Sequence, residues 1–153
     1  MNIDITDLQT VLTIPRDAMR RIVRTTLKDR PGGYSLVFVD DDRMTDMNRA
    51  HLGREGTTDV LAFAFEEPAS TDDECAGEIV VSTERARDEA HRRGIDPQVE
   101  LALYITHGAL HIAGLDDRTP DQAAEMRDRE QQVLAELGYD VRGLWEPAER
   151  EQN

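Results

Sequence analysis

The chain has 153 residues, and its 32 acidic and 18 basic side chains give a formal net charge of −14 at pH 7. This negative charge repels DNA, RNA and anionic lipid, which excludes binding through global attraction and leaves a local basic face as the means of holding phosphate. The hydrophobic content is 39%, or about 44% when glycine is counted in place of tyrosine, which is close to an ordinary globular composition and argues against wholesale disorder.

Length and cysteine content favour a single cytoplasmic domain. We expect residues 1–145 to form this domain and residues 146–153 to be a mobile tail. The one cysteine, Cys75, cannot form an internal disulfide, and its acidic neighbours favour an unreactive thiol. The N-terminus lacks the pattern of a signal peptide, and no apolar run approaches the roughly 20 residues of a membrane helix. A membrane partner is therefore not expected.

Hydrophobic periodicity predicts strands and helices in turn along the N-terminal half. Strands are expected at 2–5, where polar and apolar residues alternate, and at 34–39 and 60–65, where apolar, aromatic and β-branched residues gather between turn signals. Helices are expected at 15–30, which begins at a proline, and at 45–51. This half of the chain is therefore expected to supply three strands of a sheet.

One face of the predicted helix at 15–30 is basic. Arg16, Arg20, Arg24 and Lys28 follow an i, i+4 spacing, which places four cations in one row. Two interpretations are open: the row is the solvated outer face of an amphipathic helix, or it is a local surface that binds the phosphates of a nucleic acid.

The C-terminal half is predicted to hold one strand and three helices. After a polar loop at 66–76, a strand is expected at 78–81 and a charged helix at 83–93. The helix that begins at Pro97 is apolar nearly all the way round, which marks it as buried in the centre of the domain. A capping box precedes the last helix, which begins at Pro120. We therefore predict an α+β fold in which a small mixed sheet of about four or five strands packs against the buried helix, with other helices around it.

Two histidines of the buried helix form a candidate metal site. His107 and His111 are one turn apart on one face, close enough to hold a single ion, although a hydrogen-bonded core histidine is the alternative for each. Gly114 can adopt the left-handed conformation that ends a helix, so the chain can double back and bring Asp117 to the same point. Two imidazole nitrogens and one carboxylate oxygen, with a position left open, make a catalytic rather than a structural zinc site.

Two further positions bear on the chemistry. Glu130 interrupts the apolar row of the last helix, and an inward carboxylate needs a partner. It could accept a hydrogen bond from a ligating histidine, act as a general base or pair with an arginine, and we favour the arginine. Gly108 stands where His-Glu-x-x-His metalloproteases have their glutamate, so the sequence disfavours peptide hydrolysis. The general base is left unassigned.

Residues 107–117 resemble the H-G-x-L-H-x-x-G-x-D-H motif of the YbeY family, metal-dependent single-strand endoribonucleases of ribosomal RNA maturation and ribosome quality control. Residues 58–63 resemble the family's T-[DN]-V-L-S-F segment, and residues 77–82 resemble its G-[DE]-I-V-I strand. The resemblance runs from about residue 36 to residue 139. It implies a zincin-like fold, one divalent metal ion with zinc as the first choice, single-stranded RNA as the substrate, and the ribosome or ribosomal proteins as partners.

The chain departs from the family pattern at three positions. Asp117 replaces a third metal-binding histidine; it is a competent ligand, but its negative charge and harder oxygen donor also admit Mn, Fe or Ni. Leu52 replaces an arginine that engages substrate phosphate, and Ala62 replaces a serine. Arg54, two residues beyond Leu52, is the candidate substrate-binding residue, with a solvated loop arginine as the alternative.

The leading hypothesis is a metal-dependent endoribonuclease in which His107, His111 and Asp117 hold the metal and DNA is not a substrate. The residues by themselves support a metal-assisted hydrolase of unspecified substrate. The alternative is a metal-stabilised ribosome-assembly binding module with little catalytic activity, which would explain the loss of the arginine at Leu52 and of the third histidine at Asp117. A peptidase is a third hypothesis, weakened by Gly108.

Overall fold

The computed structural model describes residues 1–28, 30–65 and 69–145, so the expected tail at 146–153 lies outside the described residues. In chain order the elements are β1 (Asn2–Leu8), α1 (Arg16–Leu27), β2 (Gly33–Val39), α2 (Asp41–Leu52), β3 (Val60–Ala64), β4 (Cys75–Ser82), α3 (Thr83–Arg93), α4 (Pro97–Ile112) and α5 (Pro120–Glu136).

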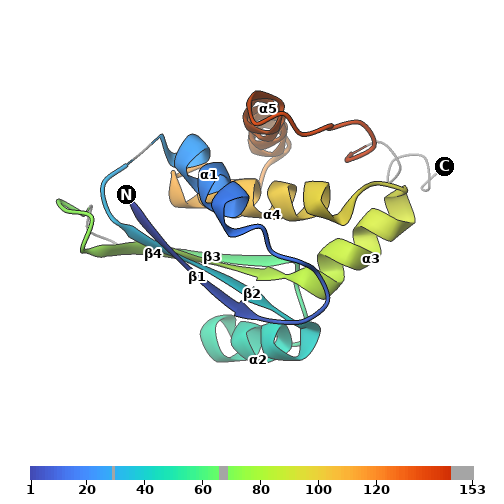
Figure 1. Cartoon of the computed structure of the whole chain (residues 1–153), viewed down its shortest axis with the longest axis horizontal. Helices are drawn as coiled ribbons and strands as arrows, with labels where there is room; N and C mark the ends of the chain where they lie inside the picture. The colour runs from blue at the N-terminus through green and yellow to red at the C-terminus, as the bar shows by residue number, and fades with distance from the viewer. Residues whose placement is uncertain (29, 66–68, 146–153) are drawn as a thin grey trace.

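The four strands form one mixed sheet in the order β1-β2-β4-β3. The strands β1, β2 and β4 are parallel, whereas β3 is antiparallel to β4, with Val60 opposite Val81 and Ala64 opposite Gly77. Figure 1 shows α2 on one side of the sheet and α1, α4 and α5 on the other. The expected α+β fold with a small mixed sheet and a central helix is confirmed.

Alternating side chains of the strands build an apolar layer on each face of the sheet. Leu36 and Phe38 of β2 join the larger cluster, which includes residues of α1 and α4. Val37 and Val39, their neighbours in sequence, point the other way and join Met44 of α2 in the smaller cluster. This follows from the period of two in a strand, and both faces are apolar because helices cover both.

The central helix, α4, packs closely on the sheet, as the sequence predicts. Its residues Leu101, Ile105 and Leu110 are fully buried. A Cβ atom at Gly108 would lie 3.0 Å from a methyl carbon of Ile79 and 3.2 Å from one of Val60, tighter than ordinary contact. The glycine therefore lets α4 approach β3 and β4, and residue 108 faces the sheet.

The first helix is shorter than predicted. It ends at Leu27 rather than near residue 30, because Lys28 adopts a left-handed conformation with φ of 52° and its backbone N–H donates to the carbonyl oxygen of Arg24. Arg16 and Arg20 donate to the carbonyl oxygens of Ile5 and Ile3 at 3.2 and 3.1 Å. These two arginines thus brace the edge strand β1.

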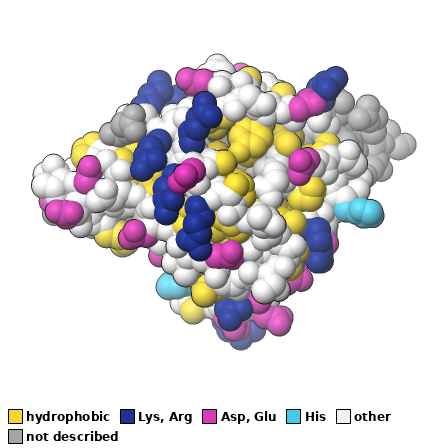
Figure 2. Space-filling view, in the orientation of Figure 1, with side chains coloured by type: hydrophobic (Ala, Val, Ile, Leu, Met, Phe, Trp, Pro, Cys, Tyr) yellow, Lys and Arg dark blue, Asp and Glu magenta, His cyan; other side chains and the backbone are white. Residues whose placement is uncertain are grey.

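The basic row nevertheless marks one face of the molecule, because Figure 2 shows lysine and arginine side chains gathered over α1. Lys28 follows the last turn of the helix and is exposed, as is Arg24. The outer face of α1 is therefore partly a brace for the sheet edge and partly a solvent-facing basic surface.

Local caps and strand pairing explain the other differences from the predicted elements. The helix expected at 45–51 begins at Asp41, because Asp40 caps it by accepting a hydrogen bond from the backbone N–H of Arg43 at 2.8 Å. The negative charge of this carboxylate also interacts favourably with the positive end of the helix dipole. The strands β1 and β4 extend to Leu8 and back to Cys75, because each pairs along the whole of β2. Cys75 is therefore an exposed strand residue.

Candidate metal centre

Three side chains converge at the C-terminal end of α4. The Nε2 atoms of His107 and His111 are 3.1 Å apart. One carboxylate oxygen of Asp117 lies 3.4 Å from Nε2 of His107, and the other lies 3.7 Å from Nε2 of His111. One potential ligand atom from each residue lies within 4.8 Å of the others. The structure therefore brings together the three residues that the sequence proposes as ligands.

The end of α4 positions the third carboxylate. Gly114 has φ of 104°, a left-handed conformation that favours glycine, and the backbone N–H of Leu115 donates back to the carbonyl oxygen of Leu110 at 3.0 Å. The chain thus reverses direction after the helix, as the sequence predicts. This reversal brings Asp117 opposite the two imidazoles.

Glu130 of α5 binds one of the two histidines. Its carboxylate oxygen lies 2.7 Å from Nδ1 of His107, and its side chain is 7% exposed. The arginine partner favoured from the sequence is therefore wrong, and the interpretation as a hydrogen-bond acceptor from a candidate ligand is correct. The sequence could not show this pair because it depends on tertiary packing: α5 packs against α4 and places the inward carboxylate of Glu130 next to the imidazole of His107.

The hydrogen bonds of the two rings indicate where their protons lie. Nδ1 of His111 faces the carbonyl oxygen of Leu115 at 3.0 Å, and a carbonyl can accept a hydrogen bond but cannot donate one. Nδ1 of His107 faces the carboxylate of Glu130 in the same way. In the neutral rings both Nε2 atoms are then bare acceptors, and they face each other and the carboxylate of Asp117. Each of these atoms has a lone pair that a divalent cation can bind, so the residues fit a metal ion.

The electrostatics of His107 favour positive charge at the same point. Burial lowers the pKa of this imidazole, but the hydrogen bond to Glu130 and the charges of Glu130, Asp117 and Asp59 outweigh burial and raise it above its ordinary value. A metal ion and a proton compete for the same nitrogen. The surroundings that stabilise the protonated ring therefore also stabilise a bound cation.

A Glu130→Gln variant is expected to bind zinc roughly 10- to 100-fold more weakly than the parent, because a neutral amide holds the His107 ring less firmly and makes it less basic. Competition with a chromophoric chelator measures this affinity. Glu125→Gln, on an exposed position of the same helix, is the matched control. Equal affinity in the two variants would contradict a supporting role for Glu130.

Two hollows open beside the three residues. A cleft of about 500 Å³ reaches His111 and is also lined by Leu52, Arg54 and Ala62. A second cavity, of about 360 Å³, reaches His107. Arg54 therefore lies on the same cleft as a candidate metal ligand, and its contact with substrate stays a prediction. Leu52, in the same cleft, is 44% exposed.

The second cavity contains a buried carboxylate to which the sequence assigned no role. Glu100 of α4 is 1% exposed, and burial raises its pKa to about 7, although the charge of Arg93 acts in the opposite direction. Glu89 and Asp59 also raise it. A glutamate in the first turn of a helix is an ordinary partner of the helix dipole, so the sequence alone did not reveal its burial.

A Glu100→Gln variant is expected to gain stability over the parent as the pH rises from about 4.5 to about 7. The folded-state pKa of Glu100, about 7, lies above its ordinary value of 4.5. Between these pH values the folded parent binds more protons than the unfolded parent, so the parent loses stability as the pH rises, whereas the glutamine variant does not. Urea unfolding at several pH values measures the difference. A gain that is the same at pH 4 and pH 8 would contradict this account of the buried carboxyl.

Among the described residues, no helix is both long and apolar enough to cross a membrane. In structure, the chain is similar to the solution structure of TM1509 from Thermotoga maritima, with a TM-score of 0.55 and 22% identity over 88% of this chain and 90% of that one. That likeness concerns the fold.

In sequence, the chain is similar to two proteins named Endoribonuclease YbeY. One, from Sulfurovum sp. (strain NBC37-1), is 34% identical and the alignment covers 86% of this chain and 88% of the relative. The other, from Symbiobacterium thermophilum, is 38% identical over 80% of this chain and 86% of the relative. The family model described as Endoribonuclease YbeY matches residues 4–138. The chain therefore belongs to the Endoribonuclease YbeY family.

Proposed function

We propose that this chain is a metal-dependent endoribonuclease that hydrolyses single-stranded RNA in ribosomal RNA maturation and ribosome quality control. The family is one of endoribonucleases, which supports RNA as the substrate. The observation that supports metal dependence is the convergence of His107, His111 and Asp117. His107 also lines one of the two cavities and His111 lines the other, so substrate could reach the site. In this proposal residues 1–145 act as one domain, the ribosome or its proteins are partners, and DNA is not cut.

The described side chains divide the work of phosphodiester hydrolysis. A bound divalent ion supplies polarisation of a phosphoryl oxygen and a lowered pKa for a bound water. His107, His111 and Asp117 would hold that ion, while Glu130 and the carbonyl oxygen of Leu115 orient the two rings. Arginines near the cleft would balance the charge that builds on the phosphate.

The donor set bears on which metal is held. Two imidazoles and a carboxylate suit zinc, which is our first choice. The carboxylate of Asp117 brings a negative charge that a third histidine would not, so Mn, Fe and Ni are the next choices. Each can be distinguished by restoring metal-free protein with one metal at a time and comparing the initial rates of RNA cleavage.

An Arg54→Ala variant is expected to raise the KM for single-stranded RNA roughly 10- to 100-fold with little change in kcat. The guanidinium lines the cleft that reaches His111, and a hydrogen bond to a charged phosphate is worth about 1.5–3 kcal/mol. Steady-state cleavage of a labelled oligonucleotide measures both constants. Arg49→Ala, at an arginine paired with Glu55 at 3.5 Å, is the control. An unchanged KM would assign Arg54 to the solvated loop.

Cleavage of an end-labelled RNA by the metal-loaded chain tests the proposal directly. We expect cuts in single-stranded RNA, which stop on removal of the metal, and none in the matching RNA duplex or DNA. The alternative, a ribosome-assembly binding module with little turnover, is favoured by the exposed apolar side chain of Leu52 in the cleft. Binding of single-stranded RNA without cuts by protein that holds its metal would favour that alternative and contradict the proposal.

A further inference from the structure

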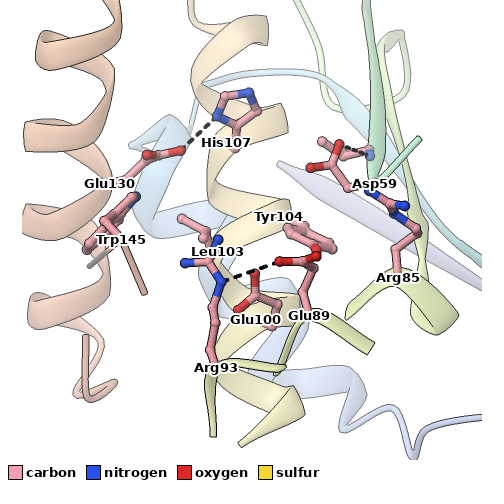
Figure 3. Close-up of a pocket in the computed structure, with 11 residues that line it drawn as sticks. Asp59, Arg85, Glu89, Arg93, Glu100, Leu103, Tyr104, His107, Glu130 and Trp145 are labelled. Carbon is pink, nitrogen blue, oxygen red and sulfur yellow. Dashed lines mark hydrogen bonds and ion pairs between the residues drawn. The ribbon is translucent and has the colours of Figure 1, made fainter. Parts of the chain in front are cut away.

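The cavity beside His107 is a built polar pocket. Its volume of about 360 Å³ lies in the range of ligand sites, about 300–1,000 Å³. Figure 3 shows Glu89, Arg93 and Glu100 together at one end, with His107 and Glu130 bound to each other toward the opposite end. The pocket therefore runs from a candidate metal ligand to a buried charged cluster on α3 and α4.

Two buried polar atoms in that cluster lack a partner among the described residues. They are Oε2 of Glu100 and Nη1 of Arg93. Glu100 is 1% exposed, and the side chain of Arg93 is 14% exposed and meets Glu89 through its Nε at 3.5 Å. Buried polar groups are nearly always paired, so one free acceptor and one free donor on the same cavity indicate a ligand that supplies their complements.

The charges of the cavity decide what kind of ligand fits. Four acidic and two basic side chains line it: Asp59, Glu89, Glu100, Glu130, Arg85 and Arg93. This excess of negative charge disfavours a phosphate group and favours a neutral ligand with a hydrogen-bond donor beside an acceptor. Tyr104, Leu103 and Trp145 add aromatic and apolar surface. Aromatic walls with hydrogen-bonding groups at one end suit a planar heterocycle such as an unstacked base.

We propose that this cavity binds a single unstacked keto base, guanine or uracil, of the RNA. The imino N–H of the base donates to the carboxylate of Glu100, and its neighbouring carbonyl oxygen accepts from the guanidinium of Arg93. The proposal rests on the proposed function, because it takes the ligand to be part of the RNA substrate.

The position of the cavity matches one nucleotide. Glu100 and His107 are two turns apart on α4, roughly 10 Å along the helix axis. That span is comparable to the distance from the phosphate of a nucleotide to the Watson–Crick edge of its own base. A base on Glu100 thus leaves its phosphate near the three converging side chains, and the pocket becomes a specificity site for the cleaved nucleotide.

Nucleosides without phosphate test the pocket separately from catalysis. The chain has a single tryptophan, Trp145, and it lines the cavity, so its fluorescence reports on occupancy. Guanosine or uridine is expected to change this fluorescence saturably in the full-length parent protein. The same nucleoside methylated on its imino nitrogen is expected to bind roughly tenfold more weakly or worse, because it cannot donate to Glu100. Adenosine and cytidine are expected to bind as weakly as the methylated forms.

Variants and cleavage assays complete the test. Glu100→Gln removes the charge of the acceptor and is expected to weaken the preferred nucleoside roughly tenfold, whereas Glu125→Gln, exposed on α5, leaves its affinity unchanged. Base-selective binding without RNA cleavage would support the proposal that the cavity binds a keto base and would contradict the proposed function. If RNA is cleaved but all nucleosides, methylated ones included, bind equally or do not bind, the proposed base site is wrong and the proposed function is unaffected.

Discussion

A His111→Ala variant is expected to cleave single-stranded RNA about a thousandfold more slowly than the parent. Removing one of the three converging ligand atoms takes away the site for a cation. A metal ion stabilises the transition state by several kcal/mol, and a loss of about 4 kcal/mol slows the reaction about a thousandfold. Single-turnover cleavage at saturating protein isolates this loss from any change in RNA affinity.

His91 provides the matched control for that measurement. It is an exposed histidine of α3, and it lies outside the converging group. His91→Ala is therefore expected to cleave at the rate of the parent. Thermal unfolding of both variants in the absence of metal checks that each is folded. A folded His111→Ala protein that cleaves RNA at more than about a tenth of the parent rate would exclude a required role for this imidazole.

A Gly108→Val variant is expected to lose about 3 kcal/mol of unfolding free energy, at the upper end of the cost of overpacking a core. The new side chain would lie between Ile79 and Val60, which leave only 3.0 and 3.2 Å to a Cβ atom. For a chain of this size such a loss lowers Tm by roughly 6–12 °C. Urea and thermal unfolding of the two proteins measure the change.

The control for this substitution separates crowding from helix propensity. Gln131→Val places the same β-branched residue on an exposed position of α5, where we expect a loss below about 1 kcal/mol. If Gly108→Val were as stable as Gln131→Val, then α4 would not need its close approach to the sheet. The same geometry bears on mechanism: a side chain at residue 108 meets the sheet rather than the metal site.

The features that sequence reasoning predicted well are those that depend on local spacing. The i, i+4 pair of His107 and His111 lies on one helix, and Gly114 reverses the chain within a few residues of it. The burial of α4 follows from its apolar composition in the same local way. Local geometry of this kind is independent of how distant segments pack, so the candidate ligands could be proposed before the fold was known.

The features that sequence reasoning missed depend on contacts between distant segments. Glu130 is 23 residues from His107, and α5 had to be placed against α4 before the pair could be seen. Glu100 and Arg93 come together across the junction of α3 and α4, where each has a buried atom without a partner in the part of the chain that the structure describes. The parallel order of β1, β2 and β4 also requires crossover connections that no local pattern specifies.

The metal content of the protein tests the central claim most directly. Untagged protein purified without chelator would be analysed by mass spectrometry beside Asp117→Ala and Asp128→Ala. Asp128 is an exposed acid of α5, and it lies outside the converging group. We predict about one equivalent of zinc or a neighbouring metal in the parent and in Asp128→Ala, and clearly less in Asp117→Ala. A parent that retains no metal even after incubation with zinc, or an Asp117→Ala protein that retains as much as the parent, would contradict the three-ligand site.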